Sequence, residues 1–82
     1  MYYAVKKVTP LDDYRLRLQF EAGEVKVFDC KPYLEIGRFS ELKNKDLFRT
    51  VVVSFDSIEW RNGLDLDPEL LYSNGVAIPS MP

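Results

Sequence analysis

The chain of 82 residues contains no histidine and one cysteine, Cys30. Histidine is the commonest metal ligand and the usual general base near neutral pH. Its absence excludes zinc sites of the Cys/His kind within one chain, and it excludes Ser-His-Asp and Cys-His catalysis. A single thiol cannot form an intramolecular disulfide, which fits a reducing compartment. We therefore expect a protein that is not an enzyme and that needs no cofactor.

Long apolar runs and a marked excess of one charge are also missing. No apolar run approaches the roughly 20 residues that span a bilayer, and the N-terminal "MYYAVKK" lacks the apolar segment of a signal peptide. The net charge of −2 gives no general attraction to nucleic acid or to an anionic membrane. The expectation is a cytoplasmic protein without a membrane partner, and no feature identifies a small-molecule substrate.

The patterns that are present predict one small α+β domain. The segment "YRLRLQF" alternates apolar and polar residues, which is typical of a half-buried antiparallel strand. Strands occur in runs separated by short helical segments, rather than in strict alternation with helices. We predict a two-layer domain over residues 1–73, with a three-stranded antiparallel sheet, a second hairpin and short helices in the order β-β-β-α-α-β-β-α. Residues 74–82 are expected to form a flexible tail.

Each run of strands contains a predicted hairpin. In the first hairpin, "EAGE" places Gly23 in the left-handed position of a bulge, and in the second, Asp56 and Ser57 form the loop. The predicted pairs are Phe20 with Val25, Leu18 with Val27, Phe55 with Ile58, and Val53 with Trp60. In the preceding strand, residues 2–9, Lys6 and Lys7 are adjacent, so one of them faces inward, lies at a bulge or lies on an edge.

Helix starts are marked by capping residues. Asn44 is the expected N-cap of a helix from Lys45 to about Arg49, and Asp67 followed by Pro68 begins the last helix. About one helical turn is expected over residues 32–37. The Asn-Gly pair at residues 62–63 predicts a turn before the last helix.

The acidic stretch "IEWRNGLDLDPELLY" admits a structural and a chemical interpretation. In the structural one, Asp67 caps the helix, Glu69 meets the positive end of its dipole, and Asp65 braces the turn at residues 62–63. In the chemical one, "DLDPE" offers three carboxylates to a metal ion, but it lacks the residue order of an EF-hand loop. The structural interpretation is favoured over a metal site, and an enzyme using the carboxylates of residues 65–69 is the least favoured.

The candidate partner-binding residues are Arg15, Arg17, Lys26, Phe28, Trp60, Asn62 and Asp65. The first three form a predicted basic face of the first hairpin, where Phe28 could stack on a base of single-stranded nucleic acid. A solvated sheet face and a protein–protein surface are the alternatives. Trp60 is expected in the core, or else at an interface as an anchor. Cys30 is expected to be a small buried apolar residue.

Two segments, "VTPLDDYRLRLQFEAGEVKVFDCKPYL" and "IEWRNGLDLDPELLY", resemble the bacterial family called domain of unknown function 2442. The likeness extends from about Val5 to Tyr72, and "W-x-N-G-x-D-L-x-P-x-x-L-Y" is its most specific motif. Arg61 stands where proline is common in that motif, and "EAGE" replaces the more typical "ENGE". The resemblance implies a small α+β fold and supplies no catalytic residues.

The resemblance also implies a role in pairs of proteins. Many members look to be encoded beside another small protein, as in toxin–antitoxin modules, and some relatives carry an added helix-turn-helix domain. Only ten residues follow Tyr72 here, too few for that domain. We expect a protein-interaction or regulatory module that binds a protein partner or self-associates through a sheet edge, and the resemblance implies the antitoxin-like member of such a pair as one form of it. A nucleic-acid-binding regulatory domain is the alternative.

Overall fold

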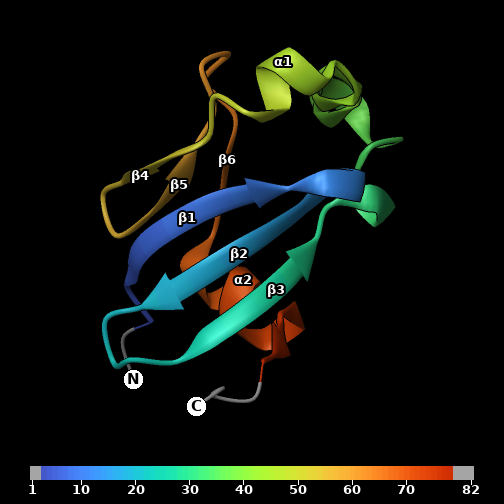
Figure 1. The fold of residues 1–82 in the computed structure, drawn as a ribbon. Coiled ribbons are helices and arrows are strands. Elements are labelled where there is room, and N and C mark those ends of the chain that lie inside the picture. The colour runs from blue at the N-terminus through green and yellow to red at the C-terminus, as the bar shows by residue number, and fades with distance from the viewer. Residues whose placement is uncertain (1–2, 79–82) are drawn as a thin grey trace.

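The computed structural model describes residues 3–78, which form two antiparallel sheets joined and covered by short helices (Figure 1). Sheet A has the strand order β1-β2-β3-β7, and sheet B has the order β4-β5-β6. The strands are β1 (Val5–Leu11), β2 (Arg15–Phe20), β3 (Val25–Asp29), β4 (Val52–Ser54), β5 (Ser57–Glu59), β6 (Asp65–Leu66) and β7 (Val76–Ala77). The predicted α+β class with an antiparallel sheet and short helices is confirmed, and β6 and β7 are additions to the predicted strands.

The helices are short, and the two α-helices begin at the predicted caps. They are η1 (Asp12–Tyr14), η2 (Lys31–Tyr33), η3 (Gly37–Lys43), α1 (Lys45–Phe48) and α2 (Pro68–Asn74), where η denotes a 3-10 helix. The Asn44 side chain accepts hydrogen bonds from the amides of Asp46 and Leu47, and the Asp67 carboxylate accepts one from the Glu69 amide. Both contacts satisfy amides that have no partner within the helix.

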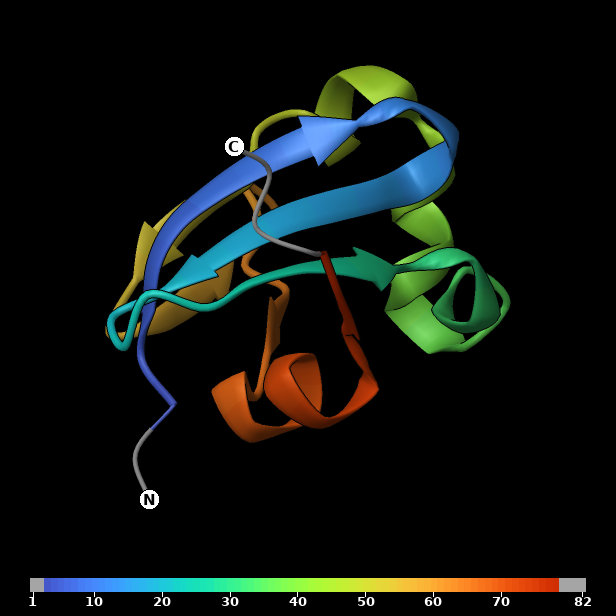
Figure 2. The same cartoon turned by 60° about the horizontal axis from the view of Figure 1, so that its bottom comes forward.

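The core lies between sheet A and a second layer made of sheet B and α2. Figure 2 shows α2 on one side of sheet A, while the opposite side of the sheet is uncovered by the described helices. The alternation of β2 is confirmed, because Leu16, Leu18 and Phe20 are buried and Arg15 and Arg17 are exposed. From the second layer, the buried side chains include Ile58, Trp60, Leu66 and Leu71.

The first hairpin has a different register from the predicted one. Gly23 has φ +100°, as the bulge required, but the loop contains three residues, and the amide of Phe20 donates to the carbonyl of Glu24. Gln19 therefore faces Val25, and Leu16 faces Phe28. The predicted pairs, Phe20 with Val25 and Leu18 with Val27, are wrong by one residue. A one-residue shift moves every side chain of β3 to the other face of the sheet.

The second hairpin also turns earlier than predicted. Ser54 pairs with Ser57, so the loop residues are Phe55 and Asp56, both with positive φ. The predicted pairs, Phe55 with Ile58 and Val53 with Trp60, are therefore wrong, and Val53 faces Ile58. Two consecutive residues with positive φ define a type I′ turn, whose twist matches that of the flanking strands.

The two edge strands of sheet A are β1 and β7. In β1 the register shifts between Val5 and Lys7, so Lys6 lies at a bulge on an edge strand, and of the placements predicted for the adjacent lysines the bulge and the edge are the ones observed. At the other edge, Val76 pairs with Val27 as part of β7. The ordered fold thus continues past the predicted boundary at residue 73, because β3 offers backbone partners to the chain that leaves α2. The last part of the predicted tail, residues 79–82, lies outside the described residues.

Candidate functional site

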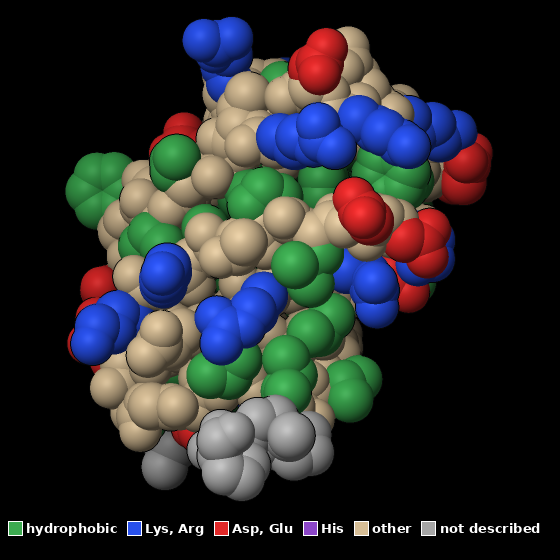
Figure 3. All heavy atoms as spheres, viewed as in Figure 1, with side chains coloured by type: hydrophobic (Ala, Val, Ile, Leu, Met, Phe, Trp, Pro, Cys, Tyr) green, Lys and Arg blue, Asp and Glu red, His purple; other side chains and the backbone are tan. Residues whose placement is uncertain are grey.

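The uncovered face of sheet A carries basic side chains beside apolar ones, as Figure 3 shows. Arg15 and Arg17 point outward from β2, and Lys7 lies on the same face because it pairs with Gln19. Both arginines and Lys7 are exposed. The predicted basic face therefore exists, but its cations come from β1 and β2. We call Lys7, Arg15 and Arg17 the basic sheet face.

The predicted contribution of β3 to this face is wrong. The one-residue register shift turns Phe28 into the core, where its ring stacks on Tyr33 with centroids 5.6 Å apart. Lys26 lies on the core side as well, and its Nζ donates to the carbonyl of Tyr72 at 2.6 Å. Its ammonium also lies 3.6 Å from the Tyr72 ring centroid. Neither residue joins Arg15 and Arg17, so the ring predicted to stack on a base is absent from the basic sheet face.

The three remaining predicted residues lie around the end of sheet B. Trp60 is buried, as the core interpretation expects, and its Nε1 donates to the Phe48 carbonyl at 3.0 Å. Asn62 braces its own turn, because its side-chain oxygen accepts a hydrogen bond from the Leu64 amide at 3.2 Å. The prediction that Asp65 does this is wrong, since Asp65 lies in β6 and pairs with Glu59.

Cys30 is buried at the end of β3, as expected. Burial raises the pKa of its thiol to about 12, with a smaller contribution from the neighbouring Asp29 carboxylate. A thiol with this pKa is protonated at neutral pH, whereas the thiolate is the reactive nucleophile. Cys30 therefore serves as a packing residue of the core and is poorly suited to act as a nucleophile.

Because the native thiol has the raised pKa, Cys30 is expected to react with iodoacetamide at least tenfold more slowly in the native chain than in the urea-unfolded chain. An unperturbed cysteine thiol has a pKa of about 8.5. The rate should rise only as the pH approaches the raised pKa. Mass spectrometry of quenched samples measures both rates. Equal rates in the native and unfolded chains at pH 7.5 would show that the thiol is accessible and ionised.

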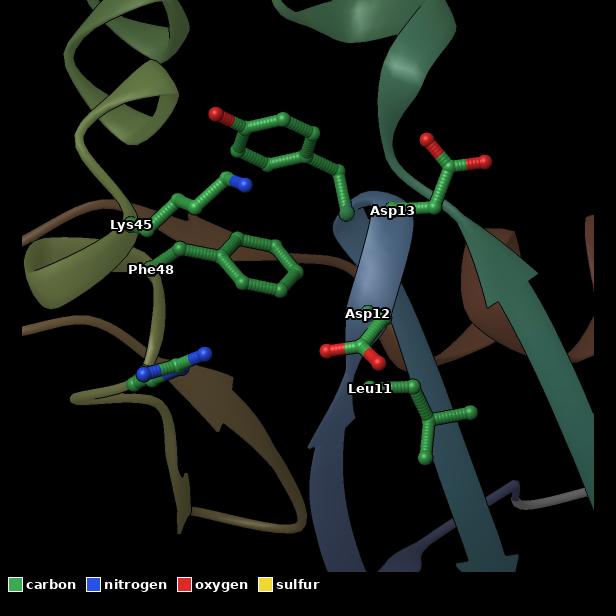
Figure 4. A pocket seen from close by; sticks show the side chains of 7 residues that line it. Leu11, Asp12, Asp13, Lys45 and Phe48 are labelled. Atoms are coloured by element: carbon green, nitrogen blue, oxygen red, sulfur yellow. The ribbon is translucent and has the colours of Figure 1, made fainter.

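A small hollow of about 100 Å³ lies between the β1–β2 turn and α1. Figure 4 shows Lys45 and Phe48 coming from α1, with Asp12 on the opposite side and the Asp13 carboxylate pointing away. Asp13 instead pairs with Lys31 at 2.9 Å, and this hydrogen bond lowers the pKa of its carboxyl. Pockets for small molecules usually enclose about 300–1,000 Å³, so this hollow is too small for most ligands.

The tip of the β4–β5 hairpin is the most exposed apolar feature of residues 3–78. Phe55 is 98% exposed, and Val52 in the adjoining strand is 56% exposed. Phe55 also has φ +48°, in a region that costs a residue with a side chain roughly 1–2 kcal/mol.

Tyr14 provides a comparison within the same chain. It also has a positive φ, +57°, but its ring packs edge-on against Phe48 with centroids 5.4 Å apart. Its hydroxyl donates to the carbonyl of Lys43. These contacts offset the backbone cost at Tyr14. No aromatic contact of Phe55 occurs within the described chain, and because the ring is exposed, the side chain offsets none of this cost.

A shallow hollow of about 290 Å³ adjoins the β4–β5 hairpin on the outer face of sheet B. Phe55 borders it together with Pro68, and the carboxylates lining it are those of Glu59, Asp65 and Asp67. Asp67 is occupied as the helix cap. Within residues 3–78, no group of Cys, Asp and Glu side chains is arranged to hold a metal ion.

Sequence reasoning missed Phe55 because two loop positions satisfy the same pattern. A loop at Phe55 and Asp56 and a loop at Asp56 and Ser57 both keep Ile58 and Trp60 on the core face. The available signal was Asp56, since aspartate tolerates a positive φ better than most residues, and it occupies the second loop position.

No helix of the described chain is long and apolar enough to cross a membrane.

The sequence profile of the family described as "Protein of unknown function (DUF2442)" matches residues 5–77. The match extends from the first residue of β1 to the last residue of β7, so it covers both sheets and all the helices. Comparisons with curated proteins and with solved structures found no match. The chain therefore belongs to the DUF2442 family of proteins of unknown function.

Proposed function

We propose that this chain is a non-enzymatic protein-interaction module of the cytoplasm. In this proposal the β4–β5 hairpin, residues 52–59, binds the partner, and we call it the docking hairpin. Phe55 is the anchor of this surface. The role expected from the resemblance, the antitoxin-like member of a two-protein pair, is one form of such a module.

The proposal rests on the exposure and the backbone conformation of Phe55. The side chain exposes an aromatic ring almost fully and holds a backbone conformation that favours glycine or asparagine. The type I′ turn needs the positive φ but not a phenylalanine, and the exposed ring adds no packing, so a contact outside the folded chain supplies the reason for a phenylalanine there. Aromatic side chains are also enriched among the residues that contribute most to binding at protein interfaces.

The surface around Phe55 supports a protein partner rather than a small ligand. Val52 extends the apolar area along β4, and the adjoining hollow is open and shallow. Small molecules bind where most of their surface is enclosed, whereas protein interfaces combine an aromatic or apolar centre with a polar rim. Glu59 and Asp65 are placed to form that rim.

An affinity pull-down from the native cell, with nuclease treatment, tests the proposal. The wild-type chain is expected to recover a protein partner in stoichiometric amount, and Phe55→Asn is expected to lose it. Ile36→Asn is the matched control, because Ile36 is 57% exposed and lies outside the docking hairpin. Equal recovery by the wild type and Phe55→Asn would contradict the assigned surface.

Nucleic-acid binding is a second candidate, which the basic sheet face favours. None of the ion pairs within residues 3–78 involves Lys7, Arg15 or Arg17, and Arg15 donates only through its Nε to the carbonyl of Asp12 at 3.3 Å. These charges are therefore not neutralised by an ion pair, and phosphates could pair with them. The nuclease arm of the pull-down separates the candidates. Recovery that disappears with nuclease and with Arg15→Glu/Arg17→Glu, but survives Phe55→Asn, would favour the nucleic acid.

A further inference from the structure

The basic sheet face adjoins an apolar strip on the same side of sheet A. Across the sheet, Arg17 pairs with Val27, and Val27 pairs with Val76, so one row carries a guanidinium beside two valines. Val76 is 71% exposed, and Val25 lies on the same side because it pairs with Gln19. Figure 3 shows blue and green side chains next to each other on this face.

The outer face of sheet B carries the opposite charge beside its own apolar group. Val52 pairs with Glu59, and Glu59 pairs with Asp65, so these side chains share one row. Neither carboxylate takes part in an ion pair in the described chain. Phe55 lies next to this row at the hairpin tip. The row on sheet A thus combines one cation with two valines, and the row on sheet B combines two carboxylates with one valine, so the two rows carry opposite charge beside apolar side chains.

We propose that the docking hairpin takes a second copy of this chain, seated on the basic sheet face. This inference rests on the proposed role of the docking hairpin. Phe55 of the first copy packs on the valines of the second copy. The carboxylates of Glu59 and Asp65 in the first copy pair with the guanidinium groups of Arg15 and Arg17 in the second. Carboxylate–guanidinium pairs form strong, directional hydrogen bonds, which fix the register of the contact.

The contact joins two different surfaces, so it is heterologous. Each bound copy keeps an unused hairpin or an unused basic sheet face, and further copies add until a ring closes. A hairpin seated on one row of a small sheet buries an area at the low end of the range for specific protein–protein interfaces. Interfaces of that size are typical of weak, transient association. Because exposed charges take part, added salt weakens it.

Mixing two defective variants tests the heterologous contact directly. Arg15→Glu/Arg17→Glu keeps an intact hairpin and loses the receiving face, whereas Phe55→Asn keeps the receiving face and loses the hairpin anchor. Each variant alone is expected to sediment at the 9.6 kDa of one chain at high protein concentration and low salt. An equimolar mixture is expected to approach twice that mass and to grow no further, and the wild type should exceed it.

Circular dichroism first establishes that both variants fold. A mixture that stays at the single-chain mass, with a wild type that does the same, would overturn the inference. The docking hairpin would still stand as a binding surface if the pull-down loses its partner with Phe55→Asn, so the two proposals fail separately. Self-association that survives both variants would assign the contact to another surface and would also overturn the inference.

Discussion

Trp60→Ala is expected to leave most of the chain unfolded at 25 °C. Trp60 is buried in the core between the layers, and removing a buried aromatic side chain costs about 3–5 kcal/mol of unfolding free energy. The Phe48 carbonyl also loses its donor from the indole, which adds about 1–3 kcal/mol if the oxygen stays dry. Natural domains have only about 5–15 kcal/mol in total, and a chain this short is at the low end.

Urea unfolding followed by circular dichroism measures this effect. Trp60→Phe is the matched control, because it keeps an aromatic ring and removes the hydrogen bond to Phe48. We expect it to fold with a stability about 1–3 kcal/mol below that of the wild type. A Trp60→Ala chain within about 1 kcal/mol of the wild type would contradict the central place of Trp60 in the core.

Phe55→Asn is expected to stabilise the fold while it removes partner binding. Asparagine adopts a positive φ more readily than phenylalanine, so the hairpin turn gains about 1 kcal/mol. The exposed ring contributes no packing that the substitution would remove. The midpoint of urea unfolding should rise, and the recovery of the partner in a pull-down should fall.

Tyr14→Asn supplies the comparison, because the same substitution is made at a similar backbone conformation. Here the ring packs on Phe48 and the hydroxyl donates to the Lys43 carbonyl, so we expect a loss of stability. Opposite signs at the two positions would support a binding role for Phe55. A destabilised Phe55→Asn chain would instead show that the ring contributes to the fold.

Local features of this fold could be predicted from the sequence. The helix caps at Asn44 and Asp67 and the alternation of β2 follow from the hydrogen-bonding and periodicity of a few neighbouring residues, and the adjacent lysines indicated an irregularity without selecting the bulge. The core placement of Trp60 follows from its apolar ring and its need for one acceptor. These features depend on short stretches of chain.

Register and surface composition could not be predicted in the same way. The loop of the first hairpin is one residue shorter than the predicted pairing needs, and this difference moved Phe28 from the basic face into the core. The strand β7 forms because β3 has a free edge next to the end of α2, which no pattern in residues 76–77 reveals. Phe55 became a candidate only through its φ and its exposure, which depend on the whole fold.

Photo-crosslinking at position 55 tests the docking hairpin most directly. Replacing Phe55 with benzoylphenylalanine keeps an aromatic group at the hairpin tip, and the same replacement of Ile36 provides an exposed apolar control. After irradiation in the native cell, we expect a specific crosslinked protein from position 55, either a second copy or a distinct partner, and none from position 36. Equal crosslinking from both positions, or none from position 55, would contradict the assignment of the docking hairpin as the binding surface.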